Sequence, residues 1–496
     1  MADRKANSIS WYSIIVFVMF CDLVLEMADI IYPIRHAILV KLIDIANQAP
    51  KALLIISGII IAVIAVTVLF RLIISGKWEA RIFFAYVIWL ILTRMMNGDH
   101  YLQRDFLVVM DIVICFLMFA STSQLNELQR DKLLSALVIV YAGFFVFVCI
   151  IGLFLTITNT YLCIDPKNDI WIRILNIDHT NNLILFSENK LICASWVYLA
   201  WALMIYAFIR NSSVFPRAVL LICSLILFIT IPLFHSRTIQ IVMAISCGML
   251  ALLIFSSILK EWSAALRIPA LTIITATAIF IGFFSYNWSN SFITGLRTFY
   301  APRFEAYYSR LESKADPDIF GIDLSSDISS DMEEQRKISA NSSLTGRTDI
   351  WKSGIIAIKR NPSALLYGSI SDDLMKPVNR ILIEEIDPSV DKDKPHMHNM
   401  FFQILMLTGI PGLLLVFVWS GLFVPKNIRF FFLKPEGKLI SAKYLTIPIA
   451  GVFIWHLVEA GLFTKTDIFG KVFFILCGVF SGYYYDNLPV VREINH

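Results

Sequence analysis

Two histidines in the segment His396-Met-His398-Asn399 are the residues best placed to do acid–base chemistry. Asn399 is a favourable N-cap for an apolar helix beginning at Met400, so His398 would lie at the positive end of a helix dipole. That field disfavours imidazolium and keeps a neutral ring that can accept a proton. The free N–H groups of the same helix end suit an anion such as a diphosphate. The pattern predicts a general base beside an anion site; the alternative is a histidine pair that only fits a membrane interface.

Two arginines could hold that anion. Arg237, in Ser236-Arg237-Thr238, occupies a short polar gap between two apolar runs, where a cation must reach the interface or find a partner. Arg347, in Thr345-Gly346-Arg347, opens an amphipathic stretch that Asn361-Pro362 ends. A guanidinium fork fits phosphate oxygens, although each side chain could simply be solvated. Arg303 could add to the same basic cluster.

Metal chemistry is not expected from this sequence. The His-x-His spacing of His396 and His398 could suit a metal, but no third His, Cys or carboxylate is positioned near it in the sequence. The eight cysteines contain no Cys-x-x-Cys pair and lie mostly in apolar runs, which is typical of small core residues. We therefore expect no metal site.

The composition indicates how such residues are positioned. Of the 496 residues, 57% are hydrophobic and only 16% are charged, against about a quarter in soluble proteins. This predicts an all-α integral membrane protein. The net charge of +4 is too weak to argue for nucleic acid, and no nucleic-acid partner is expected. About twelve spans are expected, near 11–30, 52–74, 82–96, 106–120, 133–156, 191–209, 217–234, 238–258, 268–285, 400–423, 444–463 and 467–485.

The loop charges predict the orientation. Lys and Arg gather in one set of connecting loops, which places those loops and both termini in the cytoplasm. The chain then divides into a bundle of nine spans over 1–285, a large extracytoplasmic loop with amphipathic helices over 286–398, and three spans over 399–496. Within the loop, 315–334 is polar and aperiodic, as in a solvated segment.

Two sets of ionisable residues fall inside predicted spans. Asp22, Glu26 and Asp29 share one face of the first span, and His456 and Glu459 share a face of the eleventh. Such groups are costly in a membrane and usually point inward toward partners. We expect the first set to pair with buried arginines such as Arg94 or Arg104, and a proton path in a transporter is the alternative.

Three motifs in this order resemble the O-antigen ligase/polymerase superfamily of bacterial membrane glycosyltransferases. They are Ser236-Arg237-Thr238, Thr345-Gly346-Arg347 with Trp351, and His398-Asn399 with Gly409 and Gly412. The large outer loop and a late span carrying Glu459 fit as well. The first half of the chain, through about residue 190, matches only as a set of spans.

The resemblance implies an enzyme that transfers a glycan from a polyprenyl-diphosphate carrier to an acceptor glycan, at the outer face of the bacterial cytoplasmic membrane. Arg237 and Arg347 would bind the diphosphate. His398 would be the base that activates an acceptor hydroxyl for one inverting displacement, with His396 orienting it. The other supporting residues are Ser236, Arg303, Asn399 and Glu459. No cofactor is implied, because the diphosphate is already an activated leaving group.

The resemblance covers ligases, which move a finished glycan, and polymerases, which join repeat units; the long outer loop leans toward a polymerase. Polysaccharide-assembly proteins are possible partners. Two other functions compete with it. A transporter of lipid-linked sugars could use the carboxylates of the first span, but we find no internal repeat between the halves of the chain. A non-catalytic scaffold for polysaccharide assembly is the other.

Overall fold

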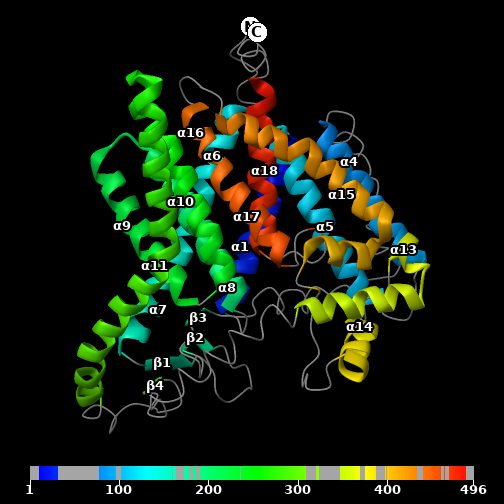
Figure 1. The fold of residues 1–496 in the computed structure, drawn as a ribbon, viewed down its shortest axis with the longest axis horizontal. Coiled ribbons are helices and arrows are strands. Elements are labelled where there is room, and N and C mark those ends of the chain that lie inside the picture. The colour runs from blue at the N-terminus through cyan, green and yellow to red at the C-terminus, as the bar shows by residue number, and fades with distance from the viewer. Residues whose placement is uncertain are drawn as a thin grey trace, which may run out of the picture.

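The structure is a computed structural model that confirms the helical membrane architecture. It describes residues 11–31, 77–96, 102–158, 160–163, 173–177, 183–185, 190–234, 236–308, 320–322, 347–368, 375–386, 397, 399–432, 439–459, 463 and 468–487. The predicted span 52–74 and the predicted solvated segment 315–334, apart from 320–322, lie outside these residues. Figure 1 shows the described helices gathered in one bundle, with further elements at one end of it.

Most of the described chain is helical, and the helices follow the apolar runs of the sequence. In the part described, seven helices are long and apolar enough to cross a membrane. In chain order the main helices are α1 (Trp11–Ile31), α4 (Trp78–Met96), α5 (Leu102–Ser123), α6 (Glu127–Leu137), α7 (Gly143–Thr158), α8 (Lys190–Arg210), α9 (Val214–Thr230), α10 (Arg237–Ile258), α11 (Ala264–Tyr308), α13 (Ala364–Tyr367), α14 (Met375–Ile381), α15 (Met400–Phe432), α16 (Leu439–Lys443), α17 (Thr446–Val458) and α18 (Ile468–Asp486).

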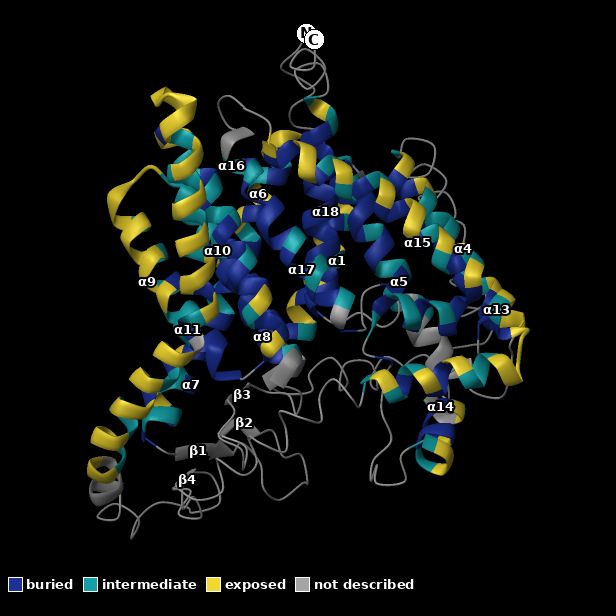
Figure 2. Ribbon diagram, viewed as in Figure 1, coloured by how far each residue is buried: buried dark blue, intermediate teal, exposed yellow. Residues whose placement is uncertain are grey.

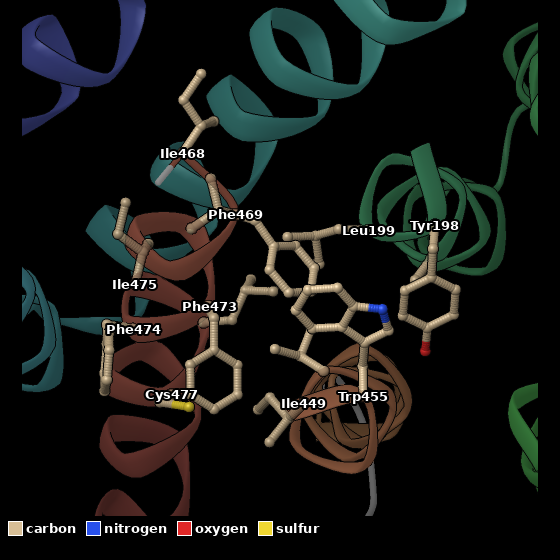
Figure 3. Close-up of a cluster of buried hydrophobic side chains, with 14 of the residues drawn as sticks. Tyr198, Leu199, Ile449, Trp455, Ile468, Phe469, Phe473, Phe474, Ile475 and Cys477 are labelled. Carbon is tan, nitrogen blue, oxygen red and sulfur yellow. The ribbon is translucent and has the colours of Figure 1, made fainter. Parts of the chain in front are cut away.

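Helix α18 is the centre of the bundle. Every residue from Ile468 to Tyr484 is buried, whereas Figure 2 shows exposed residues along α9 and α11, as in helices that face lipid. Its aromatic side chains pack with Trp455 of α17 in the cluster drawn in Figure 3. The small residues Gly478 and Gly482 let α18 approach its neighbours closely: a Cβ at Gly478 would meet the Thr122 hydroxyl of α5 at 2.0 Å.

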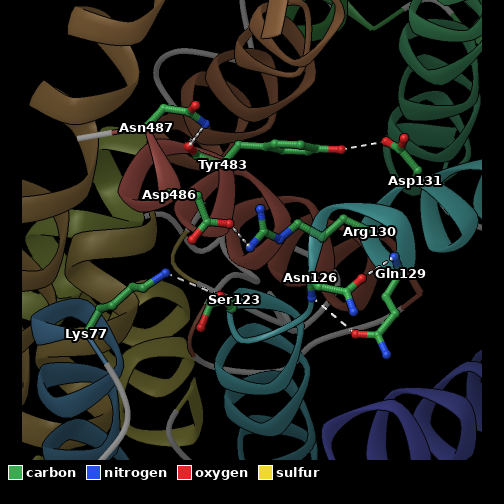
Figure 4. Close-up of polar contacts among 9 residues, drawn as sticks. All are labelled: Lys77, Ser123, Asn126, Gln129, Arg130, Asp131, Tyr483, Asp486 and Asn487. Carbon is green, nitrogen blue, oxygen red and sulfur yellow. Dashed lines mark hydrogen bonds and ion pairs between the residues drawn. The ribbon is translucent and has the colours of Figure 1, made fainter. Parts of the chain in front are cut away.

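The last turn of α18 binds cations from several other helices. Arg130 pairs with Asp486 at 2.5 Å (Figure 4), and two lysines each lie 4.6 Å from the centroid of the Tyr485 ring. Arg210 reaches the same place through its ion pair with Asp131. The four cations all come from loops predicted to face the cytoplasm: Lys77, Arg130, Arg210 and Lys426. Four of the positive charges that the sequence assigns to one side therefore meet at one end of the bundle.

Helix α11 differs from its prediction. The span was expected to end near residue 285, but the helix continues to Tyr308, which makes it about 68 Å long against about 30 Å of hydrocarbon. The extension carries polar residues that do not suit lipid, but nothing in its sequence stops a helix before residue 302. The helix therefore crosses the predicted domain boundary without a break.

A small antiparallel sheet, which the sequence did not predict, lies at the end of the bundle opposite α16 (Figure 1). Its strand order is β3-β2-β1-β4, with β1 (Thr160–Cys163), β2 (Arg173–Ile177), β3 (Leu183–Leu185) and β4 (Phe320–Ile322). Because β4 pairs with β1, the segment after α7 and the segment after α11 meet on the same side of the protein. Both were predicted to be extracytoplasmic.

Charged side chains inside the bundle are paired, as predicted for the first span. Asp22 and Glu26 of α1 contact the amine of Lys471 at 2.9 and 2.5 Å. The amine is fully buried, and Lys471 was not among the predicted partners. The side chain of Asp29 lies outside the described residues. This triad joins α1 to the central helix α18.

We predict that Lys471→Met destabilises the protein by about 2–4 kcal/mol, because two carboxylates lose the cation that compensates them. The triple variant Lys471→Met/Asp22→Asn/Glu26→Gln should regain most of the loss, since it leaves no uncompensated charge. Thermal unfolding of the purified protein in detergent measures both effects. A triple variant as unstable as the single one would show that packing of the lysine stem, not charge, holds α1.

Candidate functional site

The predicted span 400–423 is not a straight helix. The backbone leaves the helical conformation at Gly409, with φ 69° and ψ −170°, which divides α15 into an arm over 400–408 and a long helix over 410–432. The rings of Phe401 and Phe417 are 4.8 Å apart across this break. In a straight helix sixteen residues would separate them by about 24 Å. The arm therefore folds back beside the long helix. The predicted catalytic segment, His396–Asn399, directly precedes its first residue.

The sequence Gly409-Ile-Pro411-Gly412 explains the break. Pro411 has no N–H, so the carbonyl of Leu407 loses the donor it would have in a continuous helix. Gly409 adopts a conformation that is essentially limited to glycine. Gly368, with φ 77°, faces it, and a Cβ on either glycine would come within 2.6 Å of the other segment's backbone. The two glycines thus let α13 pack against the break.

Asn399 caps the arm as predicted. Its side-chain oxygen accepts a hydrogen bond from the N–H of Phe402 at 3.0 Å, and its amide donates to the carbonyl of Leu457 at 3.0 Å. The second bond attaches the start of the arm to the end of α17. His396 and His398 lie outside the described residues, but both neighbours of His398 in the chain are held in place.

Met397, on the other side of His398, is fixed by the helix over residues 347–360. Trp351 in this helix donates its indole N–H to the Met397 carbonyl at 2.8 Å, and its ring stacks on Phe402 of the arm. The Met397 N–H donates to the Gln403 side chain at 2.9 Å. The segment with the predicted base is therefore held on both sides, through the Met397 backbone and through the Asn399 side chain.

The helix over residues 347–360 begins at Arg347 and ends before Asn361-Pro362, as predicted. In this helix Ile350, Ser353 and Gly354 are buried, whereas Ile355 is exposed. The buried face is the one that packs against Met397, where a Cβ at Gly354 would collide with the Met397 side chain. Burial in this helix therefore does not follow the positions of its apolar residues alone.

The far end of that helix is also held. Arg360 makes two 2.7 Å hydrogen bonds to Glu385, which follows α14. This charge-assisted pair lowers the pKa of the Glu385 carboxyl. The helix is therefore anchored at both ends, at Arg360 and, through Trp351, at the arm.

Arg347 forms an ion pair with Glu459, the residue that follows α17. Its Nη2 atom lies 2.6 Å from the Glu459 carboxylate, which is almost fully buried, while a quarter of the Arg347 side chain is exposed. Asn399 binds Leu457 two residues earlier. The end of α17 is thus the common attachment point of the arm and the helix over 347–360. An anion reaching Arg347 would meet a guanidinium whose orientation is already fixed.

Arg237 is the first residue of α10, and Ser236 caps that helix by accepting a hydrogen bond from Ile239 N–H at 3.3 Å. The Tyr198 hydroxyl contacts Ser246 of α10 and the Ile447 carbonyl of α17. Figure 1 shows these two helices running in opposite directions, so nine residues along each, about 13 Å, bring Arg237 level with the last turn of α17. The exposed Arg237 side chain and the buried Glu459 lie at the same end of the bundle.

Arg303 is not brought to this place. It lies on the outer extension of α11, where its guanidinium stacks 3.5 Å from the centroid of the Phe299 ring. Figure 1 shows that end of α11 on the opposite side of the molecule from α13 and the 347–360 helix. Thr345 and Gly346, like His396 and His398, lie outside the described residues.

Some contacts of the site were missed in the sequence. Glu459 was placed on the same helical face as His456, but α17 ends before it, and the change in backbone direction turns its side chain to Arg347. Lys471 was missed as the partner of Asp22 and Glu26, although a lone lysine within an apolar run was a signal for a buried ion pair.

Comparison with known proteins gives one match. The family model described as O-antigen ligase matches residues 219–417, about two fifths of the chain. The matched region begins in α9, includes Arg237, Arg347 and the arm, and ends beyond the break at Gly409. It excludes Glu459. No curated protein and no solved structure matches the chain.

We predict that Gly409→Ala destabilises the protein by about 2–4 kcal/mol, because an alanine is strained at this φ and its Cβ would meet the Leu366 carbonyl at 2.6 Å. Gly421→Ala in the same helix is the matched control. It has open space around it and should be neutral or stabilising by up to about 1 kcal/mol. Thermal unfolding of the two variants compares them, and equal stabilities would contradict the role given to the break.

Proposed function

Because residues 219–417 match the O-antigen ligase family model, we propose that the chain is a membrane glycosyltransferase of the O-antigen ligase/polymerase superfamily. It moves a glycan from a polyprenyl-diphosphate carrier to a hydroxyl of an acceptor sugar. The observation that carries this proposal is that Arg347 and Asn399 both bind the end of α17, while Trp351 holds Met397, the other neighbour of His398. A fixed cation beside a fixed helix N-terminus suits a diphosphate.

In the proposed reaction Arg237 and Arg347 bind the diphosphate and stabilise the negative charge that develops on it as it leaves. His398 accepts the proton of the acceptor hydroxyl while the hydroxyl oxygen attacks the anomeric carbon, so the configuration inverts. His396 orients His398 or the acceptor. Neither metal nor nucleotide takes part, since the carrier diphosphate is the leaving group. Arg303 has no part in this diphosphate site.

Glu459 has a supporting role in this proposal. Placing a guanidinium in an apolar environment costs free energy unless a counter-charge is near. The Glu459 carboxylate supplies that charge while no lipid-linked glycan is bound. An arginine has five N–H donors, and the contact with Glu459 engages one end of the group. The remaining donors can therefore bind phosphate oxygens without breaking the ion pair.

The proposed site faces away from the cytoplasm. We place both termini in the cytoplasm with about twelve spans, nine before the outer region 286–398 and three in 399–496. This orientation is supported by the cations gathered at the other end of the bundle, around the last turn of α18. The carrier then reaches Arg237 and Arg347 from the outer leaflet of the bacterial cytoplasmic membrane. The acceptor glycan and any polysaccharide-assembly partners meet it there.

We predict that His398→Ala and Arg237→Ala abolish formation of the surface polysaccharide, because loss of a general base alone costs about 10²–10⁴ in rate. A deletion strain is complemented with each variant, and the polysaccharide is resolved by size on a gel. Arg217→Ala is the control. It removes an exposed arginine in the first turn of α9, at the end of that helix away from Arg237, and should complement fully.

The material that accumulates identifies the reaction. Single repeat units on the carrier indicate a polymerase, and complete chains that remain on the carrier indicate a ligase. Full complementation by both His398→Ala and Arg237→Ala, at normal membrane levels, would overturn the proposed catalysis and favour a transporter or a scaffold.

A second prediction separates the two roles of Arg347. Arg347→Met should lower stability by about 2–4 kcal/mol, because the buried Glu459 carboxylate loses its partner. Arg347→Met/Glu459→Gln should regain the stability but stay inactive, since the diphosphate still lacks its cation. Unfolding temperature and glycan transfer are measured on the same purified samples. Restored activity in the double variant would show that Arg347 only holds the fold together.

A further inference from the structure

Helix α4 lies outside the region that matches the family model, yet it contacts the break in α15 through two polar side chains. Trp89 donates its indole N–H to the Thr408 carbonyl at 2.7 Å, and Arg94 donates from Nη2 to the Leu407 carbonyl at 3.2 Å. These are the last two residues of the arm. Arg94 is buried, so it is committed to the interior of the protein.

Both carbonyls lose their helical donors at the break. Leu407 precedes Pro411 by four residues, and Pro411 has no N–H. Thr408 directly precedes Gly409, where the helical path is lost. An unpaired carbonyl in an apolar interior is strongly unfavourable, so a donor from a neighbouring helix fixes where the arm can lie.

Helix α4 makes a third contact of the same kind. The Tyr86 hydroxyl donates to the Phe463 carbonyl at 2.5 Å. Phe463 has a φ of 68°, which is unfavourable for a phenylalanine, and it follows Glu459 by four residues. One helix therefore binds irregular backbone next to both segments that meet at the candidate site.

We propose that α4 is the positioning helix of the site. Arg94 and Trp89 set the angle of the arm that carries His398-Asn399, and Tyr86 holds the segment after the Arg347 partner Glu459. The proposal rests on the proposed glycan transfer for its functional consequence, but the position of the arm can be measured independently. The hydrogen bonds that carry this argument go to the Thr408, Leu407 and Phe463 carbonyls, so the three residues act on the reacting groups through the backbone.

The test removes single donors. Trp89→Phe deletes only the indole N–H and the outer part of the ring, and Trp78→Phe is its matched control, because Trp78 is exposed at the start of the same helix. Arg94→Met removes the guanidinium and keeps an apolar stem, and Arg94→Lys retains a donor. Each change is combined with Met406→Cys, a buried position on the arm. Maleimide labelling of this cysteine reports movement of the arm, with native cysteine labelling subtracted.

We expect Trp89→Phe and Arg94→Met to raise the labelling rate at least fivefold and to lower kcat of glycan transfer about tenfold, with KM for the lipid-linked donor within threefold. Arg94→Lys should recover part of both effects, and Trp78→Phe should change neither. If Arg94→Met does not accumulate in the membrane, Trp89→Phe carries the test.

Labelling and kcat that stay at the control values in Trp89→Phe would overturn the positioning role, while the proposed transfer would stand. If the wild-type protein transfers no glycan but the variants still label faster, the positioning role of α4 is supported and the proposed function is contradicted. The two proposals therefore fail separately.

Discussion

The cost of an unpaired backbone carbonyl in an apolar interior shapes this protein around its site. A helix that crosses a membrane satisfies its own backbone, so every break must be compensated by a neighbour. The break at Gly409 frees the Leu407 and Thr408 carbonyls, and α4 supplies both donors. Irregular backbone can therefore exist only where other helices surround it, and the arm that ends at this break has the predicted catalytic segment at its other end.

Charge is arranged by the same principle. Two carboxylates of α1 neutralise the buried Lys471. Glu459, the residue after α17, neutralises Arg347. The cations of the loops predicted to face the cytoplasm meet the acidic and aromatic last turn of α18. The arginines proposed to bind diphosphate are thus kept at the other end, where an anionic lipid headgroup would arrive.

The candidate site is built from three segments that are distant in the sequence and are held together by hydrogen bonds to backbone atoms. The arm, the helix over 347–360 and the end of α17 come from distant parts of the sequence and meet through backbone atoms: the Met397 and Leu457 carbonyls accept from Trp351 and Asn399. Contacts to backbone constrain position without using the charged ends of functional side chains. Arg347, with one end on Glu459, keeps donors for a ligand. Such preorganisation is what electrostatic stabilisation of a leaving group requires.

The sequence by itself determined the membrane class, most spans, the N-cap at Asn399 and the limits of the helix from Arg347, because these depend on local composition, capping and proline. It also indicated that Asp22 and Glu26 need a partner. Only the tertiary structure decided that the partner is Lys471, that α15 folds back at Gly409, and that α11 continues past residue 285. It alone joined Arg347 to Glu459 and α4 to the break. The ion pairs and the contacts of α4 depend on which helices become neighbours, and residues more than a hundred positions apart leave no local pattern that names their partner.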